Sequence, residues 1–368
     1  MKVAQVVNHF HPCIGGKESI VKELSLGLKQ SGHKVSVFCL DKCAEAGKKL
    51  KPREQWNGIE INRFPFLDLR FLKVGFPNLG ELTKADLVHA HGLCFLTDFL
   101  ALTKFLYNKP LVLSTHGGIF HTKTISTLKR LYFYGWLKLI GGSFDKIIAV
   151  SKNDFELFSE IFPEEKMELI ENAINVEKFG TVKRQARPNS FLFVGRLSRN
   201  KQVDKLLEAF AIVLREKPNA VLSIVGKDFD GILPELRKKA KELSIDKNVW
   251  FKGAVSDQKL LELYSENVFF VLASSYEGFG VSAIEAMAAG LVPILNTLPS
   301  FKSFVKEGSN GFIVDFENSE SAARKMADAC SLGTKLRTIS ANAKQSVQKF
   351  SWKEKLKEFE KVYNKTIF

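Results

Sequence analysis

The stretch from 268 to 295, VFFVLASSYEGFGVSAIEAMAAGLVPIL, carries the pattern that decides the fold. An apolar run at 268–274 leads into a glycine-containing loop, then into a segment with helical spacing of its apolar residues, and then into a second apolar run at 291–295. Short apolar runs without alternation are typical of parallel strands that are buried on both faces, with a helix making the crossover between them. The stretch therefore predicts a strand–helix–strand unit of a parallel sheet.

The same pattern recurs along the whole chain. Further apolar runs that predict buried strands lie at 3–7, 34–40, 87–90, 110–115, 146–151, 191–195, 220–226 and 248–253. A polar stretch at 177–190 interrupts the series, so we expect two doubly wound α/β domains, at 1–178 and 179–351. The final segment, 352–368, has the pattern of one amphipathic helix, and a return of this helix onto the first domain is left open.

The composition is that of a globular protein. The 368 residues are 45% hydrophobic and 26% charged, which excludes a disordered or collagen-like chain. No apolar run reaches the roughly 18–20 residues that span a bilayer, and the first residues lack the pattern of a signal peptide, so we expect a cytoplasmic protein. The five cysteines form no C-x-x-C pair, so we expect reduced thiols and neither a disulfide nor a zinc site.

A net charge of +14 favours the binding of an anionic partner. Nucleic acid, anionic lipid and phosphorylated small molecules all meet that requirement. The sequence contains no recognisable nucleic-acid-binding module, so nucleic acid is not an expected partner.

Two glycine-containing loops follow strands of the first predicted domain. Gly15 and Gly16 precede a helix, where the backbone can approach a ligand and the first N–H groups of the helix are free to bind an anion. His116 ends the strand at 110–115, beside Gly117, and could contact a substrate hydroxyl or phosphate. A tight turn and a structural histidine are the alternatives for these two loops.

Other histidines lie near the same strand ends. They are His89, His91 and His121, and they share no metal-ligand spacing with acidic or thiol side chains. We therefore expect no metal site here.

The second predicted domain places two cations after its first strand. Arg196 and Lys201 could together hold a diphosphate, the first through a bidentate fork and the second as a point charge. The alternative is a solvated basic turn. Asp228 and Asp230 form a D-x-D pair after the next strand, which is a weak signal for a divalent cation.

The loop after the strand at 268–274 is the most specific candidate. Glu277 is followed by Gly278, Phe279 and Gly280, whose main-chain N–H groups point along a helix start, and Glu285 lies in that helix. A carboxylate at Glu285 suits a ribose diol and one at Glu277 suits sugar hydroxyls. The alternatives are that Ser282 and Glu285 form a capping box and that Glu277 is an ordinary exposed glutamate.

Together these motifs resemble the retaining glycosyltransferases of family 4, which have the GT-B fold of two Rossmann-like domains. EGFGVSAIE at 277–285 is similar to the family's E-x7-E motif, VGRLSRNK to its G-R-x(4)-K element, and PCIGGKE to its G-G-x-E loop. STHGG, AVSKND and IENAINVEKF resemble three further landmarks, so the similarity extends from residue 1 to the last helix.

The resemblance implies a role for each matching position. Arg196 and Lys201 would neutralise the donor diphosphate in place of a metal ion, and no cofactor is implied. Glu285 would bind the ribose, and Glu277 the donor sugar, which His116 would also contact. The implied catalytic residues are His116, Arg196, Lys201 and Glu277. The implied nucleotide-sugar site comprises Gly15, Gly16, Arg196, Lys201, Gly226, Gly253, Val255, Glu277, Phe279, Gly280, Val281 and Glu285.

STHGGIFHTK at 114–123 resembles a stretch of bacterial exopolysaccharide mannosyltransferases. That likeness implies transfer of mannose from GDP-mannose to a polyprenyl-diphosphate-linked oligosaccharide, with retention of configuration. A UDP-sugar donor, a sugar-nucleotide epimerase and a non-catalytic nucleotide-sugar binder remain as alternatives.

A basic, aromatic-rich stretch lies in the first predicted domain. Residues 121–152 contain six Lys or Arg and one acid, Asp145, interleaved with apolar side chains such as Leu131 and Trp136. Such a stretch can lie on anionic lipid, with KKLKPR at 48–53 as a second basic cluster. We therefore expect peripheral attachment to the cytoplasmic leaflet; ordinary helix packing with solvated lysines is the alternative.

Overall fold

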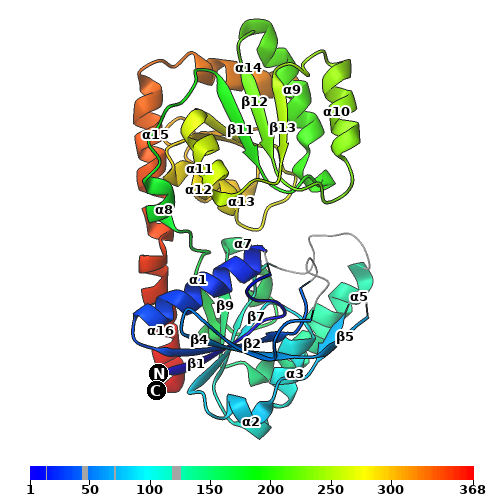
Figure 1. The fold of residues 1–368 in the computed structure, drawn as a ribbon, viewed down its shortest axis with the longest axis vertical. Coiled ribbons are helices and arrows are strands. Elements are labelled where there is room, and N and C mark those ends of the chain that lie inside the picture. Colours follow the sequence, from blue (N-terminus) through cyan, green and yellow to red (C-terminus); the bar gives the residue numbers. More distant parts are fainter. Residues whose placement is uncertain (14, 44–48, 70–71, 118–125) are drawn as a thin grey trace. The chain divides into compact units, whose positions relative to one another are not determined.

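The computed structural model describes residues 1–13, 15–43, 49–69, 72–117 and 126–368. The chain forms two compact units. Unit 1 consists of residues 1–173 and 352–368, and unit 2 consists of residues 174–351 (Figure 1). The division after Ala173 lies five residues before the predicted boundary at 178.

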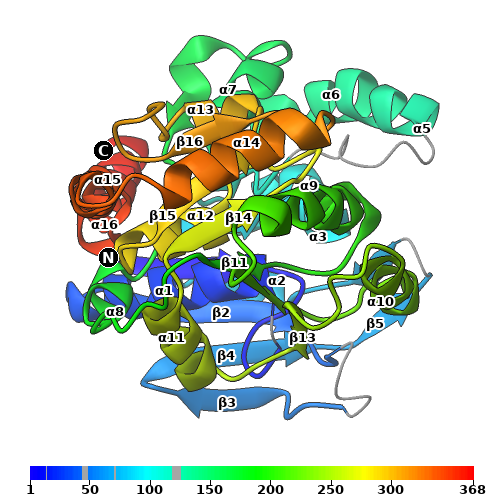
Figure 2. The same ribbon diagram turned by 90° about the horizontal axis from the view of Figure 1, so that it is seen from above.

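The sheet of unit 1 has eight strands in the order β10-β9-β8-β7-β1-β2-β4-β3, and every neighbouring pair is parallel except β3 and β4. Figure 2 shows β2, β4 and β3 side by side. The strands are β1 (Lys2–Val6), β2 (Lys34–Leu40), β3 (Arg53–Trp56), β4 (Ile59–Phe64), β7 (Leu87–His91), β8 (Leu111–Ser114), β9 (Lys146–Ala149) and β10 (Met167–Leu169), with a separate pair of β5 (Phe66–Asp68) and β6 (Lys73–Gly75).

The helices of unit 1 cover this sheet. Helix α16 packs on α1, where Leu356 lies against Gly27, and its Phe359, Val362 and Tyr363 enter the same core as Val3 and Leu87. The helices are α1 (Gly16–Gln30), α2 (Leu79–Leu82), α3 (Phe95–Leu102), α4 (Lys104–Tyr107), α5 (Ser126–Arg130), a π-helical segment (Leu131–Leu137), α6 (Lys138–Ile140), α7 (Lys152–Ser159) and α16 (Trp352–Ile367).

Unit 2 has a six-stranded sheet in the order β13-β12-β11-β14-β15-β16, and all its pairs are parallel. The strands are β11 (Ser190–Val194), β12 (Val221–Val225), β13 (Val249–Gly253), β14 (Phe269–Leu272), β15 (Val292–Asn296) and β16 (Phe312–Val314). The helices are α8 (Val176–Gly180), α9 (Val203–Glu216), α10 (Leu233–Glu242), α11 (Asp257–Glu266), α12 (Val281–Ala288), α13 (Pro299–Lys302), α14 (Ser319–Cys330) and α15 (Lys335–Ser346).

The predicted α/β class with two doubly wound parallel sheets is therefore confirmed. The unit β14–α12–β15 is the strand–helix–strand pattern of residues 268–295, and all four residues of β14 are buried because both faces of the sheet are covered. The antiparallel strand β3 was not predicted. It is joined to β4 by Asn57 and Gly58, both at positive φ, which is the Asn-Gly signature of a tight hairpin.

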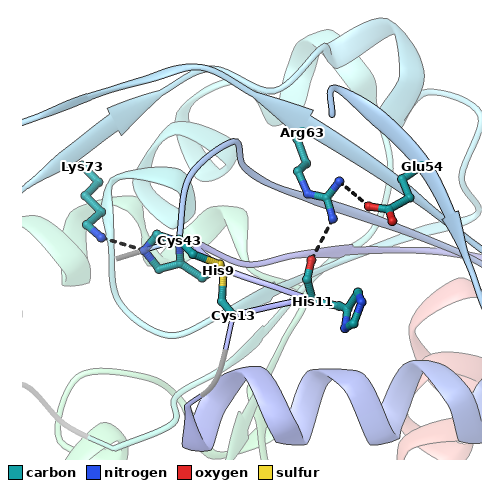
Figure 3. The surroundings of a disulfide bond; sticks show 7 residues. All are labelled: His9, His11, Cys13, Cys43, Glu54, Arg63 and Lys73. Atoms are coloured by element: carbon teal, nitrogen blue, oxygen red, sulfur yellow. Dashed lines mark hydrogen bonds and ion pairs between the residues drawn. A yellow bond between two sulfur atoms is a disulfide. The ribbon is translucent and has the colours of Figure 1, made fainter. Parts of the chain in front are cut away.

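The prediction that all cysteines are reduced is wrong. Cys13 and Cys43 form a disulfide, with their Cα atoms 5.4 Å apart (Figure 3). The pairing joins the loop after β1 to the loop after β2, two segments that are distant in sequence and adjacent in the sheet. No local spacing motif marks such a pair, which is why the sequence pattern did not reveal it. Cys39, Cys94 and Cys330 are free thiols.

Hydrogen bonds near the disulfide also hold the loop after β1 in place. The fully buried Arg63 side chain donates to the carbonyl oxygen of His11 at 2.7 Å and to Glu54 Oε2 at 2.7 Å (Figure 3). Lys73 Nζ lies 2.6 Å from His9 Nε2. The chain that leads into Gly15 and Gly16 is thus held by one covalent bond and by polar contacts from β4 and β6.

Among the described residues, no helix has the length and apolar character needed to cross a bilayer.

Candidate functional site

The loop between β14 and α12 holds a shielded ion pair. Lys201 Nζ bonds to Glu277 Oε1, and the two side chains are only 12% and 14% exposed. Ser274, two residues after β14, donates to the same oxygen at 2.9 Å. Among the described residues Glu277 Oε2 receives no such bond, so it can accept from a further donor such as a sugar hydroxyl.

The pair is held together because two loops far apart in sequence are bonded along their backbones. Asn200 accepts from Ser275 N through its carbonyl oxygen at 2.8 Å, and its side chain donates to the carbonyl of Tyr276 at 3.4 Å. Lys201 therefore stands opposite Glu277 as a consequence of main-chain geometry, in addition to the attraction between their charges.

Gly280 ends this loop and forms the N-cap of α12. Its φ of +92° is open to glycine, whereas another side chain there would press against Phe301. Phe279 is buried and makes an edge contact with Phe350 at 5.3 Å between ring centroids. Phe279 thus anchors the loop through its side chain, and Val281 begins a helix whose first N–H groups lack intrahelical partners.

The capping-box alternative for Glu285 is wrong. Helix α12 begins at Val281 with Gly280 as its cap and no side-chain cap bond, so Ser282 lies inside the helix. Glu285 is instead half-buried, and desolvation raises the pKa of its carboxyl to about 7. The nearby ammonium of Lys178 and the Tyr264 hydroxyl oppose that rise in pKa, while Asp257 adds to it.

The ends of strands β11, β12 and β13 in unit 2 are joined by backbone hydrogen bonds. Gly226 N donates to the Gly253 carbonyl at 2.9 Å, and Gly195 N donates to the Val225 carbonyl at 3.0 Å. Gly226 has a φ of +150°, and a Cβ there would overlap the carbonyl oxygen of Gly195. The strand ends can approach this closely only because position 226 has no side chain. Val255 lies two residues beyond β13 and is half-buried.

Arg196 follows directly on this junction and is exposed. Its guanidinium lies 4.7 Å from the centre of the Phe229 ring, so the aromatic side chain orients it from one face. The sequence pattern did not single out Phe229.

The D-x-D pair is engaged with the backbone. Asp228 accepts from Ile232 N at 2.9 Å and from Leu233 N at 3.1 Å, which caps α10, and Asp230 accepts from Arg199 N at 2.9 Å. No group of His, Cys, Asp and Glu within the described ranges is arranged to hold a metal ion.

In unit 1, Gly15 and Gly16 open helix α1. Gly15 is extended and serves as the N-cap, with Glu18 folded back against it. A Cβ at Gly16 would meet no described atom within 4 Å, so a ligand can approach the backbone there. The N-terminus of α1 thus has backbone N–H groups without intrahelical partners and open space beside Gly16, an arrangement that suits an anion.

His116 has a positive φ of 52°, which is uncommon for a residue other than glycine. The backbone is held in this shape because the buried Asp154 accepts from Gly117 N at 2.9 Å and from Thr115 Oγ1 at 2.5 Å. His116 Nε2 lies 2.8 Å from Nδ1 of the buried His91. His121 and Gly118 lie outside the described residues.

The structure thus brings Lys201 and Glu277 together, and Gly226 and Gly253 together, within unit 2. Gly15, Gly16 and His116 belong to unit 1. Sequence reasoning missed the supporting residues Ser274, Phe229 and Asp154, each of which acts through a tertiary contact. His91 was noted only as a histidine near a strand end.

Models of two protein families match the chain. The model described as Glycosyltransferase Family 4 matches residues 14–178, and the model described as Glycosyl transferases group 1 matches residues 176–346. A GDP-mannose:cellobiosyl-diphosphopolyprenol alpha-mannosyltransferase of Xanthomonas campestris is 35% identical over 88% of this chain and 86% of its own length. The protein of that name from Komagataeibacter xylinus is 28% identical over 100% of this chain and 94% of its own.

Solved structures share the fold. A sucrose-phosphate synthase from Thermosynechococcus elongatus matches with a TM-score of 0.77 and 19% identity over 99% of this chain and 98% of that one. Anabaena HepE in complex with UDP matches with a TM-score of 0.78 and 17% identity over 99% of this chain and 100% of that one. The fold is GT-B.

Proposed function

This chain belongs to glycosyltransferase family 4, and from that membership we propose that it transfers mannose from GDP-mannose to a polyprenyl-diphosphate-linked oligosaccharide, with retention of configuration and without a metal ion. That it is a glycosyltransferase using a nucleotide-sugar donor follows from the family. The observation that carries the finer proposal is the 35% identity, over 88% of the chain, to a relative whose name specifies this donor and a diphosphopolyprenol acceptor.

The side chains of unit 2 support a chemical role for the donor site. Departure of a nucleoside diphosphate builds negative charge on its phosphate oxygens, and fixed cations stabilise that charge most in the transition state. Arg196, oriented by Phe229, and Lys201, held by Glu277, supply two positive charges. With these charges in place, the departing diphosphate does not require a divalent ion.

The remaining donor contacts divide between the sugar and the nucleoside. Glu277 Oε2 accepts from sugar hydroxyls, and the N–H groups that open α12 are further donors to the sugar. Glu285 accepts from the ribose diol as a carboxylate. Main-chain groups at 226–228 and 253–255 read the base. The resemblance to the family separately implies donor-binding roles for Gly15, Gly16 and His116 of unit 1.

Retention follows from attack on the face that the leaving group vacates. The acceptor hydroxyl forms the new bond to the anomeric carbon as the bond from that carbon to the phosphate oxygen breaks. The phosphate oxygen takes the hydroxyl proton, so no covalent sugar–enzyme intermediate forms. Trapping of a glycosyl adduct on Glu277 would contradict this route.

The first test measures thermal stability with GDP, UDP, ADP, TDP and CMP. A nucleotide present at 100 times its dissociation constant should stabilise the protein by about 2.7 kcal/mol, and GDP should give the largest shift. Arg196→Ala should lose most of that shift. The control is Arg199→Ala, which removes a cation from the same turn that is paired with Glu235 on the surface. No shift with any of the nucleotides would overturn the proposal.

A transfer assay then separates the alternatives. GDP-mannose and a diphosphopolyprenol-linked oligosaccharide should give an α-linked product, identified by the anomeric proton in NMR. Turnover with a UDP-sugar alone would move the donor assignment to UDP, and release of a free epimer without acceptor would replace transfer by epimerisation.

We also propose that unit 1 attaches to the anionic cytoplasmic leaflet through residues 126–140. Leu131 and Leu139 are 68% and 75% exposed although apolar, and the basic side chains Arg130 and Lys138 lie among them. Apolar side chains that remain exposed beside cations favour contact with anionic lipid over ordinary helix packing. The basic residues at 121–125 lie outside the described ones.

The second basic cluster contributes less. Lys49 pairs with Asp41 at 3.5 Å and Arg53 pairs with Glu81 at 3.2 Å, so acidic neighbours already offset two of its charges. Flotation with anionic liposomes at low salt tests the attachment. Leu131→Asp/Leu139→Asp should abolish flotation, whereas Leu169→Asp, at an exposed apolar position of β10, should not. Failure of the wild-type protein to float would overturn the attachment.

A further inference from the structure

A group of polar side chains is buried beneath helices α1 and α16 of unit 1. Gln5 on β1, His89 and His91 on β7, and Ser114 on β8 are each at most 1% exposed. Buried polar groups of this kind are costly unless they are hydrogen-bonded, so their partners define what they do.

The strand register explains why these side chains meet. Gln5 is the Cα partner of His89 in the parallel pair β1–β7, and side chains two residues apart on a strand point to the same face. His89 and His91 therefore lie side by side, with ring centroids 4.0 Å apart. His89 is held between Tyr363 OH at 2.7 Å and Ser114 Oγ at 2.8 Å, and burial lowers its pKa to about 3.

His91 makes a separate connection, to Gln5 and His116. Its Nε2 lies 2.5 Å from Gln5 Oε1, and its Nδ1 lies 2.8 Å from His116 Nε2. An amide oxygen can only accept a hydrogen bond, so the proton of a neutral His91 is on Nε2. Its Nδ1 then carries a lone pair and can only accept, which places the proton of His116 on Nε2.

Both rings are neutral in this arrangement. Burial holds the pKa of His91 and of His116 well below the ordinary value, and the ammonium of Lys17, in the first turn of α1, lowers both further. A neutral His116 with its proton on Nε2 has an unprotonated Nδ1 as its remaining polar atom.

We infer that His91, oriented by Gln5, is a positioning residue that holds His116 in the Nε2–H tautomer. His116 then acts toward the donor as a hydrogen-bond acceptor through Nδ1, and it selects a hydroxyl of the sugar over a phosphate oxygen, which has no proton to give. The tautomer itself follows from unit 1 alone. Its role toward a sugar hydroxyl rests on the proposed function.

The tautomer is tested without any activity measurement. Protein labelled with ¹⁵N in its seven histidines gives ring-nitrogen shifts that distinguish the two neutral tautomers, and His116→Ala identifies the His116 signals by their loss. The wild-type protein should show His116 with its proton on Nε2. A proton on Nδ1 in the wild-type protein would overturn the inference, whatever the variants do.

Two substitutions at position 91 separate positioning from packing. His91→Asn keeps an amide oxygen near the place of Nδ1 and should retain the Nε2–H form of His116, whereas His91→Leu fills space without an acceptor and should lose it. Gln5→Leu should act in the same direction as His91→Leu. If the tautomer of His116 is unchanged in folded His91→Leu, His91 does not set it.

Kinetics with the nucleotide sugar complete the test. His91→Leu should reduce kcat by about tenfold, the size of one lost hydrogen bond in the transition state, while the Kd for GDP stays unchanged. His91→Asn should recover most of that loss. The expected tautomer without turnover of any nucleotide sugar would count against the proposed function and leave the tautomer assignment standing. Equal loss in both variants would overturn the link between tautomer and rate.

Discussion

Lys201 and Glu277 are bonded to each other across 76 positions of sequence, with both side chains almost fully shielded from water. The pair joins the cation assigned to the diphosphate to the carboxylate assigned to the sugar. Each charge therefore fixes the position of the other, so the proposed contacts to the diphosphate and to the sugar depend on one electrostatic pair.

The stability losses on removing Lys201 and on removing Glu277 should not be additive. Lys201→Met and Glu277→Gln should each lower the free energy of unfolding by about 2–3 kcal/mol, because each leaves a shielded polar group unpaired. The double variant should cost at least 1 kcal/mol less than the sum of the two singles, since the orphaned charge is gone. Urea denaturation of the four proteins gives the coupling energy, and additive losses would show that the pair is only a surface contact.

The raised pKa of Glu285 should appear in the pH dependence of stability. With a pKa of about 7 in the folded protein and about 4.3 unfolded, the carboxyl binds more protons when folded at intermediate pH. Its contribution is therefore fully present below about pH 4 and is lost as pH rises through 7, by on the order of 3 kcal/mol. Thermal melts from pH 4.5 to 8 on the wild-type protein and Glu285→Gln measure this. Parallel pH profiles would contradict the raised pKa.

Gly226→Ala should disrupt the donor loop. The added Cβ overlaps the Gly195 carbonyl, so β11 and β12 must separate where Arg196 follows, at a cost of more than about 2 kcal/mol. The control is Gly231→Ala in the same loop, where φ is also positive at 71° but no described atom lies within 4 Å. Only the backbone penalty of about 1 kcal/mol applies there. Nucleotide affinity and melting temperature should fall for Gly226→Ala and change little for Gly231→Ala; equal losses would remove the close approach as the cause.

The disulfide should contribute to the stability of unit 1. Cys13 and Cys43 are 30 positions apart, and closing a loop of that length restricts the unfolded chain by about 3–4 kcal/mol. Cys13→Ser/Cys43→Ser should lower the free energy of unfolding by that amount, and a dithiol reductant should bring the unfolding midpoint of the wild-type protein to that of the double variant. Cys94→Ser, at a free thiol, is the control. A reductant with no effect on the wild-type midpoint would contradict the prediction.

The sequence predicted those features that depend on local pattern. The run of residues 268–295 predicted β14, α12 and β15 because burial on both faces leaves a continuous apolar signal. The Asn57-Gly58 turn carried an equally local signal, which identifies the hairpin in retrospect.

Features that depend on tertiary contacts could not be predicted in the same way. Ser282 and Glu285 fit a capping box by spacing, yet the positive φ available to Gly280 starts the helix elsewhere. The Cys13–Cys43 bond and the contact of His91 with His116 each join loops or strands whose adjacency is set by the order of the sheet. Sheet order is not visible in any local window of residues.

The place of helix α16 in the sequence affects the order in which the two units can fold. It buries Phe359, Val362 and Tyr363 in the core of unit 1, but the ribosome produces it only after all of unit 2. Ribosomes add about 5–20 residues per second. The helix that covers Val3 and Leu87 is therefore made roughly 10–35 s after the first 173 residues. Unit 2 is continuous in sequence and can fold during that interval. The part of the enzyme that is synthesised first is therefore the part that is completed last.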